Sequence, residues 1–256
     1  AIVQPADAYH AHDLPALLPA YIAARIKRAR LVYDAHELWT ERGSAGSDTE
    51  YWRRLEQWFI RRVDGVITVN QSRARIMHEE YGAAQLPTVV RNCPPSGGLS
   101  AKKTTRLRSL VARSGAPDPK IALYQGSISP GRGYDELVTA AQYMNEGIAV
   151  VILGYGSPET YLDHLKQRVT DLGLTERVFF HPPVQNDEMM EYTRSADVGL
   201  VFYDDNSRNN RYCAPNKLYE YMMAGLPSVA SDLPGIQEIV QTEDVGTTVD
   251  STHPRA

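Results

Sequence analysis

The sequence predicts an α/β fold of two doubly wound parallel-sheet domains that face a cleft. Short apolar runs alternate with longer amphipathic stretches, and this alternation is interrupted once. Glycine-rich or polar segments follow several of the apolar runs. A chain of 256 residues, 43% hydrophobic and 23% charged, is long enough for two modest globular domains.

Nine apolar runs are predicted to be buried parallel strands. They cover residues 8–12, 31–34, 65–69, 88–91, 121–125, 149–153, 178–180, 198–202 and 227–230. Helices are predicted between them at 14–28, 49–62, 71–81, 134–144, 158–172, 187–196 and 216–224. Because crossover connections are right-handed, the carboxyl ends of the strands meet at one edge, where ligands bind. Chemistry is therefore expected in the loops after the strands.

A stretch rich in proline, glycine and serine at 91–103 reads as an interdomain linker. It places the boundary near residue 98, with a partial first domain at 1–98 and a second, incomplete at its C-terminal end, at 99–256. The chain lacks an initiator methionine and ends without an obvious closing element. It is therefore expected to be trimmed at both ends.

Charge and cysteine content exclude several classes of protein. A net charge of −4 gives no bulk reason to expect nucleic acid as a partner. No apolar run is long enough to span a bilayer, and the first residues do not resemble a signal peptide. Two cysteines far apart, Cys93 and Cys213, indicate a reducing compartment, so a cytoplasmic location is expected.

A glycine-rich loop, YQGSISPGRGYDEL at 124–137, joins a predicted strand to a predicted helix. Gly126, Gly131 and Gly133 would let the backbone approach a ligand, and the N–H groups of a helix start favour phosphate. Arg132 can add a bidentate, charge-assisted contact. A tight turn with an exposed arginine explains the spacing equally well.

The segment RYCAPNKLYEYMMAGLP at 211–227 places Asn216 where a helix begins. Lys217 and Glu220, three residues apart, share one face of its N-terminus. A lysine there can hold a diphosphate and a carboxylate can accept ribose hydroxyls, although a solvated ion pair would look the same. Leu218 and the methionines after it pack this helix into a core, which leaves its polar start at the sheet edge.

The loop HPPVQNDE at 181–188 follows another predicted strand. Its prolines fix an extended chain, so that Pro183 and Val184 would form a flat apolar wall suited to a nucleobase. A loop that merely contains prolines explains this segment as well.

Two polar clusters follow consecutive strands of the first half. AYHAHD places His10, His12 and Asp13 at one strand end, and VYDAHELW places Asp34, His36 and Glu37 at the next. Such residues converge on one sheet edge, so a functional role is expected. Histidines and carboxylates are zinc ligands, but no HxxxH helix spacing and no cysteine pair is present. No metal and no other cofactor are therefore expected.

A basic, amphipathic helix is predicted at 50–62, with Trp52, Leu55 and Phe59 on one stripe. The pattern is compatible with peripheral contact with anionic lipid on the inner face of a membrane. Packing of the stripe on the sheet explains it too, and is favoured.

Together these residues resemble the retaining glycosyltransferases of the two-Rossmann-domain type, family 4 ("glycosyl transferase group 1"), whose fold is called glycosyltransferase B. The resemblance is strong over 120–246 and fair over 7–92. Its most specific part is PNKLYEYMMAGLPSVASDLPGIQEIV at 215–240. This part looks like the helix that binds the ribose and diphosphate of a sugar nucleotide, followed by the loop against the donor sugar.

The resemblance implies roles for the matching residues. The donor would be bound by Gly126, Ser127, Arg132, Val184, Asn216, Lys217, Leu218 and Glu220. The catalytic group would comprise His36, Glu37, Arg132 and Lys217, and the acceptor side His12 and Asp13. Arg132 and Lys217 would hold the diphosphate, Glu220 the ribose and Val184 the base.

The sequence departs from this family in three respects. Tyr212 stands where many members carry a second acid, eight residues before the ribose glutamate, and Ser127 stands where many carry an arginine. The family's first strand with its glycine-rich loop, and its final helix, are absent from the sequence. These departures put contacts to the donor sugar in question.

The resemblance implies a retaining, hexosyltransferase-like enzyme. It would move a sugar from a UDP- or GDP-linked donor to a saccharide or lipid-linked acceptor, as in polysaccharide biosynthesis. Cationic side chains and helix N–H groups would stabilise the leaving diphosphate without a metal. Two alternatives remain, namely a non-hydrolysing sugar-nucleotide 2-epimerase and a catalytically degenerate module that only binds nucleotide sugars.

Overall fold

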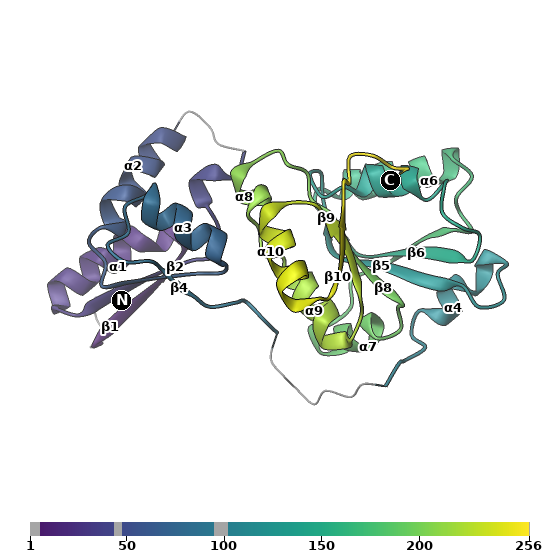
Figure 1. The fold of residues 1–256 in the computed structure, drawn as a ribbon, viewed down its shortest axis with the longest axis horizontal. Helices are drawn as coiled ribbons and strands as arrows, with labels where there is room; N and C mark the ends of the chain where they lie inside the picture. The colour runs from purple at the N-terminus through teal and green to yellow at the C-terminus, as the bar shows by residue number, and fades with distance from the viewer. Residues whose placement is uncertain (1–5, 44–47, 95–101, 256) are drawn as a thin grey trace. The chain divides into compact units, whose positions relative to one another are not determined.

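In the computed structural model, which describes residues 6–43, 48–94 and 102–255, the chain divides into two compact units (Figure 1). The first unit comprises residues 1–92 together with 205–214, and the second comprises 93–204 together with 215–256. The boundary predicted near residue 98 lies outside the described residues. The sequence analysis did not anticipate that 205–214 groups with the first unit.

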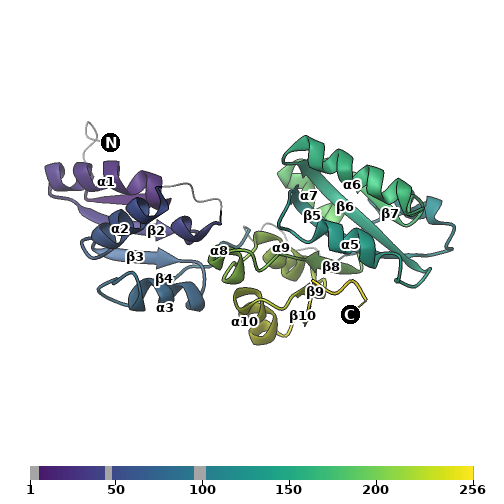
Figure 2. The ribbon, with the colours of Figure 1, turned by 90° about the horizontal axis from the view of Figure 1, so that it is seen from above.

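The first unit is built on a parallel sheet whose strands follow chain order, β1-β2-β3-β4 (Figure 2). The strands are β1 (Ala8–His12), β2 (Arg30–Ala35), β3 (Gly65–Thr68) and β4 (Thr88–Val89). Its helices are α1 (Asp13–Lys27), η1 (Trp39–Glu41), α2 (Thr49–Ile60), α3 (Gln71–Glu79) and α8 (Arg208–Arg211). The strands and the three longer helices agree with the predictions to within a few residues.

The apolar stripe of α2 faces the core of the first unit. Phe59 and Ile60 are buried there, and Trp52 and Leu55 pack against the same cluster. Helix packing on the sheet, the favoured explanation of this amphipathic pattern, therefore accounts for the stripe. Within the described residues, none of the helices combines the length and apolarity needed to cross a membrane.

A carboxyl group is buried in the same core. Glu56 on α2 is 0% exposed, and its Oε1 accepts a hydrogen bond of 2.6 Å from the Tyr33 hydroxyl on β2. The Thr40 hydroxyl donates to its Oε2 at 3.5 Å. Burial raises the pKa of Glu56 from 4.5 to about 7, because desolvation outweighs these hydrogen bonds to the charged form.

The second unit contains a six-stranded parallel sheet in the order β10-β9-β8-β5-β6-β7 (Figure 2). The strands are β5 (Lys120–Ile128), β6 (Ile148–Gly156), β7 (Val178–His181), β8 (Val198–Val201), β9 (Ser228–Ser231) and β10 (Gly246–Val249). The helical segments are α4 (Arg108–Val111), η2 (Ala112–Ser114), α5 (Tyr134–Ala140), α6 (Glu159–Asp171), α7 (Asn186–Thr193), α9 (Asn216–Ala224) and α10 (Pro234–Glu243). Strand β10 and helices α4, α8 and α10 were not predicted.

Helices cover both faces of the second sheet, which explains why its strands read as continuous apolar runs. Alternate residues of a strand point to opposite faces. Ala122 and Tyr124 on β5 join a core with α5 and α6, whereas Ile121 and Leu123 are fully buried outside that cluster. The sequence signature of a doubly covered parallel sheet is therefore borne out.

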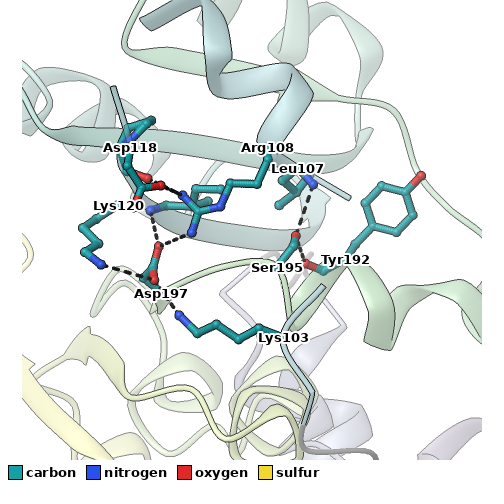
Figure 3. A network of polar contacts seen from close by, with 10 residues as sticks. Lys103, Leu107, Arg108, Asp118, Lys120, Tyr192, Ser195 and Asp197 are labelled. Atoms are coloured by element: carbon teal, nitrogen blue, oxygen red, sulfur yellow. Dashed lines mark hydrogen bonds and ion pairs between the residues drawn. The ribbon is translucent and has the colours of Figure 1, made fainter. Parts of the chain in front are cut away.

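A polar network secures the start of the second unit to the amino ends of its central strands (Figure 3). Asp197, just before β8, accepts a hydrogen bond of 2.7 Å from Lys103 Nζ and one of 2.9 Å from the backbone N–H of Ile121. Arg108 donates at 3.3 Å to Oδ2 of Asp197, the oxygen that also accepts from Ile121. Desolvation raises the pKa of Asp197, but these partners outweigh it and hold the pKa below 3.8. The network lies at the edge opposite the carboxyl ends of the strands.

Candidate functional site

The strand order places a topological switch point beside β5. From β5 the chain continues to β6 and β7 on one side, and then returns to β8 on the other side. In open α/β sheets ligands bind where the strand order reverses in this way. Strands β5 and β8 pair only at Ala122 and Leu123, so β5 continues beyond its partner at this point.

The Tyr221 hydroxyl on α9 forms hydrogen bonds with backbone groups of β5 where the pairing of β5 with β8 ends. Its hydroxyl donates to the Leu123 carbonyl at 3.0 Å and accepts from the Gln125 N–H at 3.1 Å. The ring also lies where a side chain at Gly199 would have to be, since a Cβ there would come within 2.2 Å of it. Helix α9 is thereby fixed against the switch point.

We expect Tyr221→Phe to destabilise the second unit by about 1–3 kcal/mol, because a buried N–H and a buried carbonyl would lose their partner. Hydrogen exchange of the β5 amides, followed by mass spectrometry, measures this effect. Tyr155→Phe, which removes the hydroxyl of a tyrosine that is 56% exposed on neighbouring β6, is the control and should leave the exchange unchanged. Equal exchange in both variants would contradict the assigned role of Tyr221.

The glycine-rich loop turns tightly between β5 and α5. Gly126, near the carboxyl end of β5, has a φ of +116°, and a Cβ there would lie 3.7 Å from the Cε and Nζ of Lys217. Gly133 has a φ of +60°, and its Cβ would come within 2.7 Å of Phe202. Both positions therefore favour glycine for its backbone conformation, and Gly133 for space as well.

Two cationic side chains flank the Tyr203 ring at this loop. Lys217, in the first turn of α9, is 6% exposed, and its Nζ lies 3.9 Å from the centroid of Tyr124 and 5.8 Å from that of Tyr203. The Arg132 guanidinium lies 5.3 Å from the Tyr203 centroid and donates to its hydroxyl at 3.3 Å. The structure thus brings together Gly126, Arg132 and Lys217, as the sequence analysis expected.

The carboxylate of Glu220 lies one turn further along α9. Its Oε2 accepts a hydrogen bond from the Gln125 side chain, whose own oxygen accepts one of 2.9 Å from the Thr193 hydroxyl. Gln125 is 1% exposed, so this chain of hydrogen bonds fixes the orientation of Glu220. No hydrogen bond from another described residue reaches Oε1 of Glu220. That oxygen can accept hydroxyl groups of a ligand.

The other residues predicted to bind the donor differ in whether their side chains could contact a ligand. Asn216 is exposed at the first position of α9, and Ser127 is half-buried, its carbonyl accepting from the Tyr134 hydroxyl at 3.1 Å. Leu218 is fully buried, so its side chain packs in the core and only its backbone could meet a ligand. Val184 follows β7, which is separated from β5 by β6.

The polar residues predicted in the first unit gather at the ends of β1 and β2. His12 Nδ1 lies 3.1 Å from His36 Nε2, and Asp13 accepts a hydrogen bond of 3.0 Å from the His36 N–H. Burial raises the pKa of Asp13, partly offset by that hydrogen bond. Glu37 instead forms an ion pair of 2.9 Å with Arg42, both of them exposed.

The segment 211–227, treated as one in the sequence analysis, is divided between the two units. Its first residues, which include Tyr212, belong to the first unit, and the residues from 215 onward belong to the second. Arg208 binds both carboxylate oxygens of Glu80 at 2.7 and 2.8 Å, and Asn70 donates to the Tyr212 carbonyl at 3.0 Å. The Tyr212 side chain packs against the core of the first unit. This packing gives Tyr212 a structural role at a position where many members of the family that the sequence resembles carry an acid.

The sequence analysis did not identify several residues that shape these sites. Buried Arg73 donates to the His36 carbonyl and to the Asn209 side chain, the latter at 2.8 Å, and so holds the loop after β2. No local pattern marks such long-range contacts. Gln125, a polar residue at the end of an apolar run, was a signal that could have been used. Tyr203, just past β8, carried no such signal.

Comparison with known sequences gives two family matches that together cover both units. The profile described as "Glycosyl transferases group 1" matches residues 119–256, more than half of the chain. That described as "Glycosyl transferase 4-like domain" matches residues 2–93.

Individual proteins agree with these matches. A D-inositol 3-phosphate glycosyltransferase from Acidothermus cellulolyticus is 27% identical over 97% of this chain and 57% of its own length. One from Xylanimonas cellulosilytica is 26% identical over 98% of this chain and 61% of its own. The chain thus spans about three fifths of the length of these relatives.

Solved structures show the same fold. Anabaena Alr3699/HepE, crystallised with UDP and glucose, superposes with a TM-score of 0.77 at 21% identity, over 97% of this chain and 65% of that one. Sucrose-phosphate synthase from Thermosynechococcus elongatus gives 0.76 at 19% identity, over 98% and 62%. With its two parallel-sheet units of glycosyltransferase B type, this chain belongs to the glycosyl transferase group 1 family.

Proposed function

We propose that the chain forms the substrate-binding core of a glycosyltransferase that takes a sugar from a nucleotide diphosphate donor, with retention of configuration. The observation that carries this proposal is the arrangement of side chains around Gly126, near the carboxyl end of β5. Lys217 and Arg132 flank the Tyr203 ring there, and Glu220 is fixed one turn along the same helix as Lys217.

The spacing of these groups suits a nucleoside diphosphate. Two positive side chains and the N–H groups at the start of α9 offer a place for the phosphates. The Glu220 carboxylate, whose Oε1 receives no hydrogen bond from another residue in the described ranges, suits the two hydroxyls of a ribose. Val184 and its loop, with the flanking prolines, are proposed for the base.

Charge stabilisation explains how these groups would promote transfer. The bond from the anomeric carbon to the β-phosphate oxygen breaks, and the acceptor oxygen bonds to the same face of that carbon. The acceptor proton passes to the departing phosphate oxygen. Lys217 and Arg132 stabilise the negative charge that grows on the diphosphate, which is where electrostatic catalysis contributes most. No step in this scheme requires a metal at the diphosphate.

The relatives narrow the proposed substrates. A similar protein binds UDP and glucose, which favours a UDP-linked donor over a GDP-linked one. Other relatives carry the name D-inositol 3-phosphate glycosyltransferase, which favours a polyhydroxylated acceptor such as a saccharide, free or lipid-linked. His12, Asp13, His36 and Glu37 are proposed for the acceptor side.

Calorimetric titration with UDP and GDP tests the donor site. We expect UDP to bind, and Glu220→Gln to weaken that binding by about 10- to 100-fold, because hydrogen bonds to a charged group contribute about 1.5–3 kcal/mol. Glu176→Gln, at an exposed glutamate just before β7 and so at the opposite edge of the sheet, is the matched control.

Two results would refute this assignment: no nucleotide binding by the folded protein, or equal UDP affinity in Glu220→Gln and the wild type. Donor turnover with and without an acceptor then separates the remaining possibilities. A transferase turns over the donor when an acceptor is present, whereas a 2-epimerase turns over the donor without one. A binding module leaves the donor unchanged in both cases.

A further inference from the structure

Three imidazoles surround one carboxylate oxygen at the carboxyl end of the first sheet. His10 and His12 come from β1, Asp34 from β2 and His36 from the loop just after β2. Oδ2 of Asp34 lies 3.0 Å from His10 Nε2 and 3.5 Å from both His12 Nδ1 and His36 Nε2. Potential metal-ligand atoms of His10, His12 and Asp34 all lie within 4.8 Å of one another.

Strand geometry explains why these side chains meet. His10 and His12 are two residues apart on a strand, so they point to the same face of the sheet. The β1–β2 register sets His12 opposite Asp34, which continues that face onto the next strand. The motif HxH followed by DxH, on neighbouring parallel strands in this register, thus gathers four potential ligands. The HxxxH spacing sought in the sequence analysis applies to helices and does not detect this arrangement.

Four of the distances in this cluster are close to those between the ligands of a tetrahedral metal ion. Nitrogen and oxygen ligands bond zinc at about 2.0–2.2 Å, which places them about 3.3–3.5 Å apart around a tetrahedron. The contacts of Asp34 Oδ2 with the three imidazoles, at 3.0–3.5 Å, and that of His12 Nδ1 with His36 Nε2, at 3.1 Å, lie close to this range.

The surroundings hold these groups in place. The Asp34 side chain is only 13% exposed, whereas those of His10 and His12 are 47% and 60% exposed, so an ion can reach them. The His36 backbone is fixed on both sides, its N–H by Asp13 and its carbonyl by buried Arg73. Such outer contacts orient metal ligands in known sites.

We propose that the first unit binds one divalent transition-metal ion of the zinc class, through His10, His12 and Asp34. His36, whose Nε2 lies 3.5 Å from Asp34 Oδ2 and 3.1 Å from His12 Nδ1, lies beside these ligands and can supply a fourth. Imidazole and carboxylate ligands suit such an ion, and zinc in proteins is usually bound by four ligands in a tetrahedron. The proposal departs from the metal-free expectation drawn from the sequence. It does not depend on the proposed donor site in the second unit.

Titration of the metal-stripped protein with Zn²⁺, followed by calorimetry, tests the proposal. We expect one ion per chain, and an affinity at least about 10-fold lower in His12→Asn and in Asp34→Asn, since even outer-shell changes cost that much. His164→Asn is the matched control, because it removes another exposed histidine that lies 3.2 Å from an aspartate, Asp135. Its affinity should equal that of the wild type.

A second readout guards against variants that fail to fold. All three tryptophans, Trp39, Trp52 and Trp58, lie in the first unit, so their fluorescence reports its unfolding. Zn²⁺ should raise the midpoint of thermal unfolding in the wild type and in His164→Asn, but much less in a folded His12→Asn protein. Absence of binding in the wild type, or equal binding in His12→Asn, would overturn the proposal. Neither measurement requires a nucleotide, so failure of the donor site would not affect it.

Discussion

Replacing Lys217 with methionine is expected to lower the rate of sugar transfer by about 100- to 1,000-fold, the usual effect of removing one group that stabilises transition-state charge. Methionine keeps a long apolar side chain at this buried site, where the Lys217 Nζ lies 3.9 Å from the centroid of the Tyr124 ring, so the fold should persist. The measurement is the single-turnover rate of transfer from a UDP-sugar, with saturating donor and acceptor. Such conditions separate a slower chemical step from weaker binding.

Lys166→Met is the matched control for Lys217→Met. Lys166 lies on α6, where its side chain is 48% exposed and pairs with Asp163 one turn away. Its charge should contribute little, as is usual for surface ion pairs. Transfer by Lys217→Met at a rate within about threefold of the control would show that Lys217 does not stabilise the leaving group.

The Glu56→Gln variant is expected to gain stability over the wild type as the pH rises. The difference between their free energies of unfolding should be about 3 kcal/mol more favourable to the variant at pH 8 than at pH 4. A rise of the Glu56 pKa from 4.5 in the unfolded chain to about 7 in the folded one corresponds to a free energy of this size. Between these two values the folded state binds more protons than the unfolded state. The free energy of unfolding of the wild type therefore falls as the pH rises through this range, and levels off above about pH 7.

Glutamine removes this ionisation but keeps the buried hydrogen bonds. Its amide oxygen can accept from the Tyr33 hydroxyl and its amide group can donate to Thr40. The stability of the variant relative to the wild type should hence increase from pH 4.5 to pH 7. Urea unfolding at several pH values, followed by tryptophan fluorescence, measures this difference.

Glu50→Gln provides the control on the same helix. Glu50 is exposed at the start of α2, where it pairs with Arg54 at 2.8 Å. The loss of such a surface pair should change stability by less than about 1 kcal/mol, with little dependence on pH from 4.5 to 7. If the stability difference between Glu56→Gln and the wild type is also independent of pH, then Glu56 ionises normally in the folded protein despite its burial.

The sequence by itself determined the class of fold and the types of residue at the candidate donor site. Buried parallel strands appear in the sequence as short apolar runs because both faces are covered, and nine of the ten strands in the described part of the chain were found in this way. Gly126, Arg132, Lys217 and Glu220 stood out because glycine-rich turns and polar helix starts are local patterns. Strand β10 was missed because GTTV lacks an apolar run.

Only the tertiary structure decided which distant groups meet. The pairing of Gln125 with Glu220, and the union of 205–214 with the first unit, depend on strand order and chain path. Likewise, the cluster of His10, His12, Asp34 and His36 depends on the register of β1 against β2. Local periodicity reports which face of an element is buried, and so specifies the elements. It carries no information about contacts between segments far apart in the chain, which arise from the packing of the whole unit.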